Sequence, residues 1–239
     1  MFNTSKTRQN SFSTSSNITY DAGLRDYMLK VYNNMGLALV ISGIVSFLVA
    51  SSPALMNAIF TTPLQWVVLF APLVFVFYFS AKISSISAAK AQTYLWIFAS
   101  LMGLSLAPIL LAYTGASIAK TFFISASVFG SMSLYGYTTK KDISGWGSFL
   151  FMGLIGIIIA SLVNIFLKSS GLDFAVSIIG VLVFTGLTAY DSQRIKGMYF
   201  QFAGNTESIS KAATMGALAL YMDFINLFLM LLRFFGERR

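Results

Sequence analysis

Two stretches near the C-terminus decide the fold, FTGLTAYDSQRIKGMY (184–199) and ALYMDFINLFLMLL (219–232). Each places one acid, Asp191 or Asp223, in or against an apolar run long enough to cross a membrane. A charged side chain in hydrocarbon costs roughly 3 kcal/mol or more unless it is paired, protonated or hydrated. The chain holds only 8 acidic residues, so the placement of two of them at these positions needs a reason.

The composition around these stretches is that of a polytopic membrane protein. Of the 239 residues, 56% are hydrophobic and 10% are charged, whereas soluble domains carry about 25% charged residues. The net charge of +8 comes from basic residues in short gaps between apolar runs, which favours membrane orientation over nucleic-acid binding. We therefore expect the lipid membrane as the chain's environment and no nucleic-acid partner.

The chain contains no Cys and no His. That excludes disulfides, thiol nucleophiles, the usual zinc sites and His-based acid–base chemistry. No P-loop, EF-hand loop or nucleophile elbow is present, so we do not expect an enzyme or a resident cofactor. A metal ion bound here would be a hard, oxygen-preferring cation such as Ca²⁺.

The apolar runs predict an all-α integral membrane protein with seven transmembrane helices. The Ser/Thr/Asn-rich segment 1–20 is expected to be a disordered cytoplasmic tail, followed by one domain over 21–239. Within it we predict a short interfacial helix at 21–30, a gap at 114–120 and a polar loop at 192–211. The predicted spans are 33–51, 64–81, 92–113, 121–138, 146–167, 174–190 and 212–233.

Basic residues predict the orientation. With the N-terminus in the cytoplasm, only Lys120 and Lys168 fall in the loops outside. Arg233, Arg238 and Arg239 would also lie outside, which mildly favours an alternative with six spans and a re-entrant last segment. We prefer seven spans because 212–232 is long enough to cross. The basic residues on the cytoplasmic side are then Lys6, Arg8, Arg25, Lys30, Lys82, Lys90, Lys140, Lys141, Arg194, Lys196 and Lys211.

The two acids differ in depth. Asp191 falls at the cytoplasmic end of the sixth span, where it could cap a helix, pair with Arg194 or take part in a site. Asp223 lies about halfway along the seventh span, where an acid usually faces a cavity or a partner. Asn226 is one turn away on the same face and could orient Asp223. Lys82, at the inner end of the second span, is either a counter-charge for the acids or an orientation charge.

If Asp191 and Asp223 face each other, they form one coupled titrating pair that shares a proton. Such a pair could hold a pore shut and change state with pH or Ca²⁺, because carboxylate oxygens are suitable Ca²⁺ ligands. The candidate gating and ion-binding residues are therefore Asp191 and Asp223, with Lys82, Asn226 and Arg194 as possible support.

Three segments resemble the Bax inhibitor-1 family, also called the transmembrane Bax-inhibitor-motif family. They are VFGSMSLYGYTTKKDIS (128–144), IGVLVFTGLTAYDSQRIKGMY (179–199) and GALALYMDFINLFLMLLRFFG (216–236). The likeness is greatest to the bacterial YccA/YbhL-type branch of the inner membrane and covers about residues 20–239. In some members a basic residue on the second helix latches the acid pair. The candidate here is Lys82, which lacks the bidentate geometry of Arg.

The resemblance implies a fold in which six helices surround the last one. It also implies a pH-sensitive calcium leak channel gated by an aspartate pair, which the motifs AYDSQ and MDFIN place at Asp191 and Asp223. The alternative is a non-transporting regulator that binds a membrane protease such as FtsH, with the 1–20 tail as a docking segment. A secondary transporter ranks last, because the sequence has no internal repeat.

Overall fold

The computed structural model describes the backbone of residues 4–239 and the side chains from residue 22 onward. The described residues form helices and no strand, and all of the helices except α2 are long and apolar enough to cross a membrane. This confirms the all-α fold with seven spans. The tail predicted over 1–20 lies outside the residues described in full and stays a prediction. The helices are α1 (Thr4–Ala50, with Ala22–Ala50 as its span), α2 (Pro53–Phe60), α3 (Leu64–Lys82), α4 (Ala88–Ala112), α5 (Gly115–Thr138), α6 (Trp146–Leu167), α7 (Ser170–Gln201) and α8 (Thr206–Phe235).

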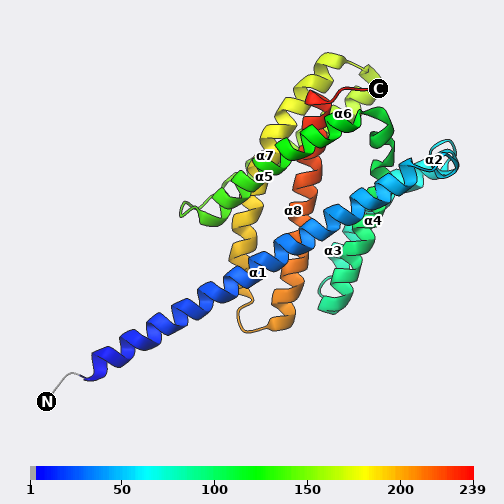
Figure 1. The fold of residues 1–239 in the computed structure, drawn as a ribbon. Coiled ribbons are helices and arrows are strands. Elements are labelled where there is room, and N and C mark those ends of the chain that lie inside the picture. Colours follow the sequence, from blue (N-terminus) through cyan, green and yellow to red (C-terminus); the bar gives the residue numbers. More distant parts are fainter. Residues whose placement is uncertain (1–3) are drawn as a thin grey trace.

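Helix α8 is the central helix of the bundle (Figure 1). Of its most apolar stretch 67% is buried, against 11% for α3 and for α6. Helices α1, α4, α5 and α7 pack directly on α8, whereas α3 packs on α4 and α6 packs on α7. The predicted arrangement of six helices around the last one is confirmed, with α3 and α6 as its most peripheral members.

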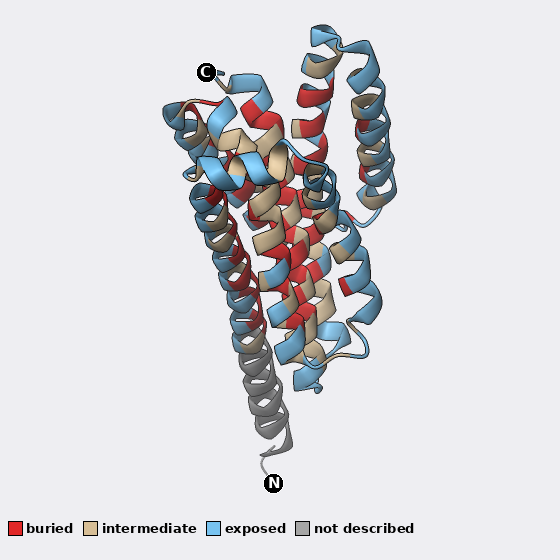
Figure 2. Ribbon diagram, turned by 90° about the vertical axis from the view of Figure 1, so that its right-hand side faces the viewer, coloured by how far each residue is buried: buried red, intermediate tan, exposed pale blue. Residues whose placement is uncertain are grey.

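The outward faces of the helices are exposed (Figure 2), and many large apolar side chains lie on them, as a bilayer requires. Large side chains such as Phe77, Phe149 and Phe166 are among those left exposed by the protein itself. Buried residues instead gather on the sides of the helices that face one another (Figure 2). Burial against neighbouring helices is thus concentrated on α8, the helix that carries Asp223.

Polar side chains fix where the helices begin. Ser87, Thr114 and Ser169 each accept a hydrogen bond from a backbone N–H in the first turn of α4, α5 and α7, the geometry of an N-cap. Helix α5 therefore begins at Gly115. The gap predicted over 114–120 is wrong, because a single Thr cap is enough to start the helix there.

We call the end of the bundle that carries the loops 83–87, 139–145 and 202–205 the inner end, because the basic residues predict that it faces the cytoplasm. The polar loop predicted over 192–211 is wrong: α7 continues to Gln201 and α8 starts at Thr206. Gly204, with φ 91°, makes the turn, and Asn205 caps α8. The charged residues of this region lie on helix surfaces beyond the apolar spans, so polarity did not signal a loop.

The helix predicted separately at 21–30 is likewise continuous with the first span, because α1 runs unbroken to Ala50. Charged residues at Arg25 and Lys30 mark a change of environment along α1 and not a break in it. Nothing in this segment is a helix breaker, since Pro is absent and Gly23 alone is a weak one.

The C-terminal tail lies at the opposite, outer end of the bundle (Figure 1). Its backbone pairs with the turn between α4 and α5: Thr114 N–H donates to Glu237 O and Arg239 N–H donates to Ala112 O, each at 3.0 Å. Arg233 pairs with Asp173 at 3.8 Å. Helix α8 thus crosses the whole bundle, and the basic residues that argued mildly against seven spans have partners at the outer end.

Glycines set the position of α7 in the bundle. The backbone of α5 at Gly136 approaches α7 so closely that a Cβ there would meet the carbonyl group of Ala189. On the other side of α7, Gly147 of α6 lies against the ring of Tyr190. These two contacts are made by the two residues directly before Asp191, and they fix the part of α7 that carries this acid.

Candidate functional site

Asp191 and Asp223 adjoin in the structure, each buried to more than nine-tenths of its surface. Asp223 lies near the middle of α8 and Asp191 lies closer to the inner end, on α7. Their carboxyl groups lie close enough to interact directly. The Oδ2 atom of Asp223 is buried and has no hydrogen-bond partner among the described residues. A buried polar atom without a partner is rare and calls for a proton or an ion.

Both acids line one cavity of about 500 Å³, which we call the acid cavity. It is enclosed by α6, α7 and α8 and begins at the first turn of α6, near the inner end. The walls are mainly apolar, with Ser148, Tyr190 and Asn226 as additional polar groups. The full lining is Gly147, Ser148, Phe151, Leu154, Phe184, Leu187, Tyr190, Asp191, Arg194, Ala219, Met222, Asp223 and Asn226.

Arg194 is the cation at this site. Its guanidinium lies 3.0 Å from Oδ1 of Asp191, one turn back along α7, and 5.8 Å from the centre of the Tyr190 ring. The Arg194 side chain is 51% exposed, whereas that of Asp191 is 11% exposed. The predicted pairing of these two residues is therefore present, and it partly neutralises the shallower acid while leaving the deeper one without a cation.

Arg194 also lines a second cavity of about 660 Å³, between α3, α7 and α8. Ala219 and Met222 of α8 are shared between the two cavities as well. The two cavities therefore meet at Arg194, on the side of α8 that faces the space between α3 and α6. The guanidinium stands between the acid cavity and this second cavity, which neither Asp191 nor Asp223 lines.

The residues that follow Asp191 hold α7 in place through hydrogen bonds. Ser192 bonds to Ser133 of α5 at 2.8 Å and donates to Thr188 O at 2.7 Å. Gln193 accepts from Ile143 N–H at 2.9 Å and donates to Lys141 O at 2.8 Å, so it fixes the loop between α5 and α6.

Lys196 completes this series, because its ammonium donates to Tyr137 O at 2.9 Å at the end of α5. The positions of Ser192 and Gln193 were not expected from sequence, although both lie in the motif AYDSQ. Their role is to orient the helix that carries Asp191.

Helix α8 is anchored by Tyr221, two residues before Asp223. Its hydroxyl bonds to Ser42 of α1 at 2.6 Å, and Ser42 donates to Ala99 O of α4 at 2.7 Å. Tyr221 is fully buried and packs edge-on against Phe98. Helices α1 and α4 thus hold the turn of α8 that carries Asp223.

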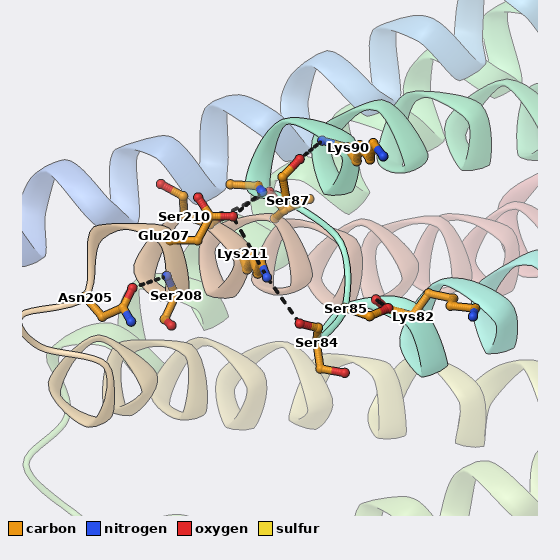
Figure 3. A network of polar contacts seen from close by, with 12 residues as sticks. Lys82, Ser84, Ser85, Ser87, Lys90, Asn205, Glu207, Ser208, Ser210 and Lys211 are labelled. Carbon is orange, nitrogen blue, oxygen red and sulfur yellow. Dashed lines mark hydrogen bonds and ion pairs between the residues drawn. The ribbon is translucent and has the colours of Figure 1, made fainter.

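The supporting residues predicted from sequence separate into two groups. Asn226 and Arg194 both line the acid cavity. Lys82 does not: it ends α3, and its backbone carbonyl accepts from Ser85 (Figure 3). Within the part of the chain whose side chains are described, the cation paired with Asp191 is Arg194, from the same helix.

A polar cluster joins α8 to the loop between α3 and α4 at the inner end (Figure 3). Glu207 of α8 accepts from Ala88 N–H at the start of α4 at 2.6 Å, and it lies 3.9 Å from Lys211. Lys211 also donates to Ser84 O at 3.4 Å. The cluster ties the first turns of α8 to the loop between α3 and α4.

The site offers oxygen donors and no thiolate or imidazole. Among the described residues no group of three or more His, Cys, Asp or Glu side chains comes together. Ca²⁺ takes six to eight oxygen ligands, so two carboxylates would hold it together with water and neutral oxygens such as those of Ser148 and Asn226. The arrangement suits brief occupancy by a partly hydrated cation.

Comparisons with known proteins agree with this structure. The family model described as "Inhibitor of apoptosis-promoting Bax1" matches residues 24–239. A protein of Rickettsia prowazekii is 53% identical over 95% of both chains. A protein of Caulobacter vibrioides is 48% identical over 93% of this chain and 92% of its own. "Inner membrane protein YbhL" of Escherichia coli K12 is 49% identical over 91% of this chain and 94% of its own. With six spans around a central, acid-bearing seventh and a match over most of its length, the chain belongs to the Bax inhibitor-1 family of integral membrane proteins.

Proposed function

We propose that this protein is a calcium leak channel of the bacterial inner membrane whose conductance depends on pH through Asp191 and Asp223. The observation that carries the proposal is the buried, unpartnered Oδ2 of Asp223, next to Asp191 at the end of a cavity. A carboxylate so placed needs a proton or a cation. Calcium is then the transported ion and not a resident cofactor.

The two acids differ in what neutralises them. Asp191 already has Arg194, whereas Asp223 has only its neighbouring acid and the cavity. A divalent cation entering from the inner end would meet Asp191 first and Asp223 second. Protons compete with Ca²⁺ for the same oxygens, because a metal ligand must be deprotonated. We therefore expect conductance to fall as the pH is lowered.

The experiment that tests the proposal is Ca²⁺ influx into liposomes that contain the purified protein and a trapped fluorescent indicator. Wild-type liposomes should fill faster than protein-free liposomes, and Asp191→Asn/Asp223→Asn should return the rate to the protein-free level. The matched control is Asp142→Asn, an exposed acid in the loop between α5 and α6. Hydrogen bonds from Ser144 hold the pKa of Asp142 below its usual range, so this acid is ionised throughout and should not affect influx.

If the double variant carries as much Ca²⁺ as the wild type, the acid pair is not the pathway and the proposal fails. If wild-type liposomes fill no faster than protein-free ones, the leak itself is absent. The unfolding temperature of each variant, measured in the same detergent, separates loss of transport from loss of fold.

Removal of the Arg194 charge should accelerate influx. Arg194→Gln removes the positive charge beside the acid pair. An incoming cation is then repelled less on its way to the two acids. Because the guanidinium is half exposed, the effect should be modest, up to about fivefold, the range of an exposed ion pair. Influx at alkaline pH measures it.

The control for Arg194→Gln is Arg233→Gln, which removes the arginine of another ion pair at the outer end. This variant should leave the influx rate unchanged. Arg194→Lys, which keeps the charge, should also stay near the wild-type rate. An equal rate in Arg194→Gln and wild type would show that the guanidinium does not control access to the acids.

The second function expected from the resemblance, regulation of an FtsH-type membrane protease, stays a prediction. Its proposed docking segment, 1–20, lies outside the side chains that the structure describes. Deletion of 1–20 should abolish co-purification with the protease while Ca²⁺ influx stays unchanged. Influx through that truncated protein thus distinguishes a docking tail from a part of the channel.

A further inference from the structure

A groove between the inner halves of α1 and α5 is separate from the acid cavity. Helix α1 packs on α4 and α8, whereas α5 packs on α7 and α8. Their inner halves leave a groove of about 390 Å³ between them. Leu29 of α1 and Leu134 of α5 are exposed on its two sides, so the groove opens toward the bilayer.

The groove combines apolar walls with positive charge at one end. Met28 and Phe129 form buried parts of the wall. Arg25 lines the groove at its inner end, where the charged part of α1 meets the apolar span. Tyr137 also lines it, and the Lys196 ammonium lies 5.2 Å from the centre of that ring. Among the described residues that line the groove there is no carboxylate.

The deep end of the groove is closed by hydroxyl groups that already have partners. Tyr32 and Ser133, both lining residues, bond to each other at 2.7 Å, and Ser133 bonds to Ser192. From Arg25 to Tyr32 the groove runs about 10 Å along α1, at ~1.5 Å per residue. That length accepts part of a hydrocarbon chain lying along the helices and is too short for a partner helix.

We infer that the α1–α5 groove binds one anionic phospholipid of the inner leaflet, such as phosphatidylglycerol. One acyl chain lies between Leu29 and Leu134, and the phosphate lies beside Arg25 with the Lys196 charge nearby. Basic pockets between transmembrane helices on the cytoplasmic side are suited to anionic head groups. A zwitterionic lipid would bring its own positive charge to a mouth that Arg25 already lines, so the groove favours a net negative head group.

Native mass spectrometry of the detergent-purified protein, with added phosphatidylglycerol or phosphatidylethanolamine, tests this inference. Wild type should retain one phosphatidylglycerol in preference to phosphatidylethanolamine. Arg25→Gln should weaken phosphatidylglycerol binding about fivefold, the effect of one basic residue near a membrane surface, and Arg25→Lys should restore most of it. Lys90→Gln, a cytoplasmic charge outside the groove, is the control for charge alone.

A second variant tests the hydrocarbon part independently. Gly130 lines the groove and a Cβ there meets no atom within 4 Å, so Gly130→Leu should fill the groove without disturbing the fold. It should abolish lipid retention, whereas Gly156→Leu, an equally open glycine on α6, should not. Equal retention of both lipids by wild type, or undiminished binding in both Arg25→Gln and Gly130→Leu, would overturn the inference. The readout is binding, so it does not depend on Ca²⁺ transport.

Discussion

Asp223→Asn should slow Ca²⁺ influx about tenfold or more at alkaline pH. The substitution keeps the shape of the side chain and removes the charge at the deep end of the acid cavity. A cation passing this point loses one of its two carboxylates, and each loss of ~1.4 kcal/mol in its stabilisation is a factor of ten. Because the buried Oδ2 of Asp223 has no hydrogen-bond partner among the described residues, the variant should remain folded.

The comparison with Asp191→Asn makes this prediction specific. Asp191 has Arg194 beside it at 3.0 Å, so its replacement leaves a positive charge without a partner at the entrance to the cavity. Asp191→Asn should therefore slow influx at least as much as Asp223→Asn. The addition of Arg194→Gln to Asp191→Asn should restore part of the lost influx rate. If Asp223→Asn takes up Ca²⁺ at the wild-type rate, Asp223 has a role in the fold and none in ion passage.

Gly136→Ala should cost about 1–3 kcal/mol of stability, the range for overpacking a well-packed contact. The added methyl group would meet backbone atoms of Ala189 and not a flexible side chain, so α5 and α7 must move apart. Asp191 lies two residues further along α7, and the displacement should separate it from Asp223. A drop in unfolding temperature of about 2–4 °C per kcal/mol, together with slower Ca²⁺ influx, is the expected result.

Gly130→Ala is the matched control on the same helix. Its Cβ meets nothing within 4 Å, and Ala favours a helix over Gly by about 1 kcal/mol. This variant should be as stable as wild type or more stable. If Gly136→Ala behaves like Gly130→Ala, the close approach of α5 to α7 does not position Asp191.

Hydropathy and the cost of acids in hydrocarbon were enough to predict the fold and to single out the two acids as candidates. Each span is a long apolar run, and Asp223 stands out in its run because an unpaired charge there is costly. The resemblance in the AYDSQ and MDFIN motifs added the arrangement of six helices around the last. The structure then brought Asp191 and Asp223 together, which no pattern within one helix could establish.

The polar contacts that support the site could not be predicted in the same way. Hydropathy marks where a helix leaves the membrane and not where it ends, so the sequence predicts a loop where the structure has the inner parts of α7 and α8. Lys82 and Arg194 are both basic residues near the inner end, and sequence alone does not give their positions relative to Asp191. The i, i+3 spacing of Asp191 and Arg194 was the available signal, since residues three apart are neighbours on a helix.

The pH profile of Ca²⁺ influx into proteoliposomes tests most directly the claim that Asp191 and Asp223 act as one unit. In wild type the account predicts an influx that rises with pH as protons leave the pair. In Asp191→Asn and in Asp223→Asn it predicts slow influx without the wild-type pH profile, because either substitution leaves a single carboxyl group that has no neighbouring acid with which to share a proton. A wild-type pH profile in both single variants would contradict the account.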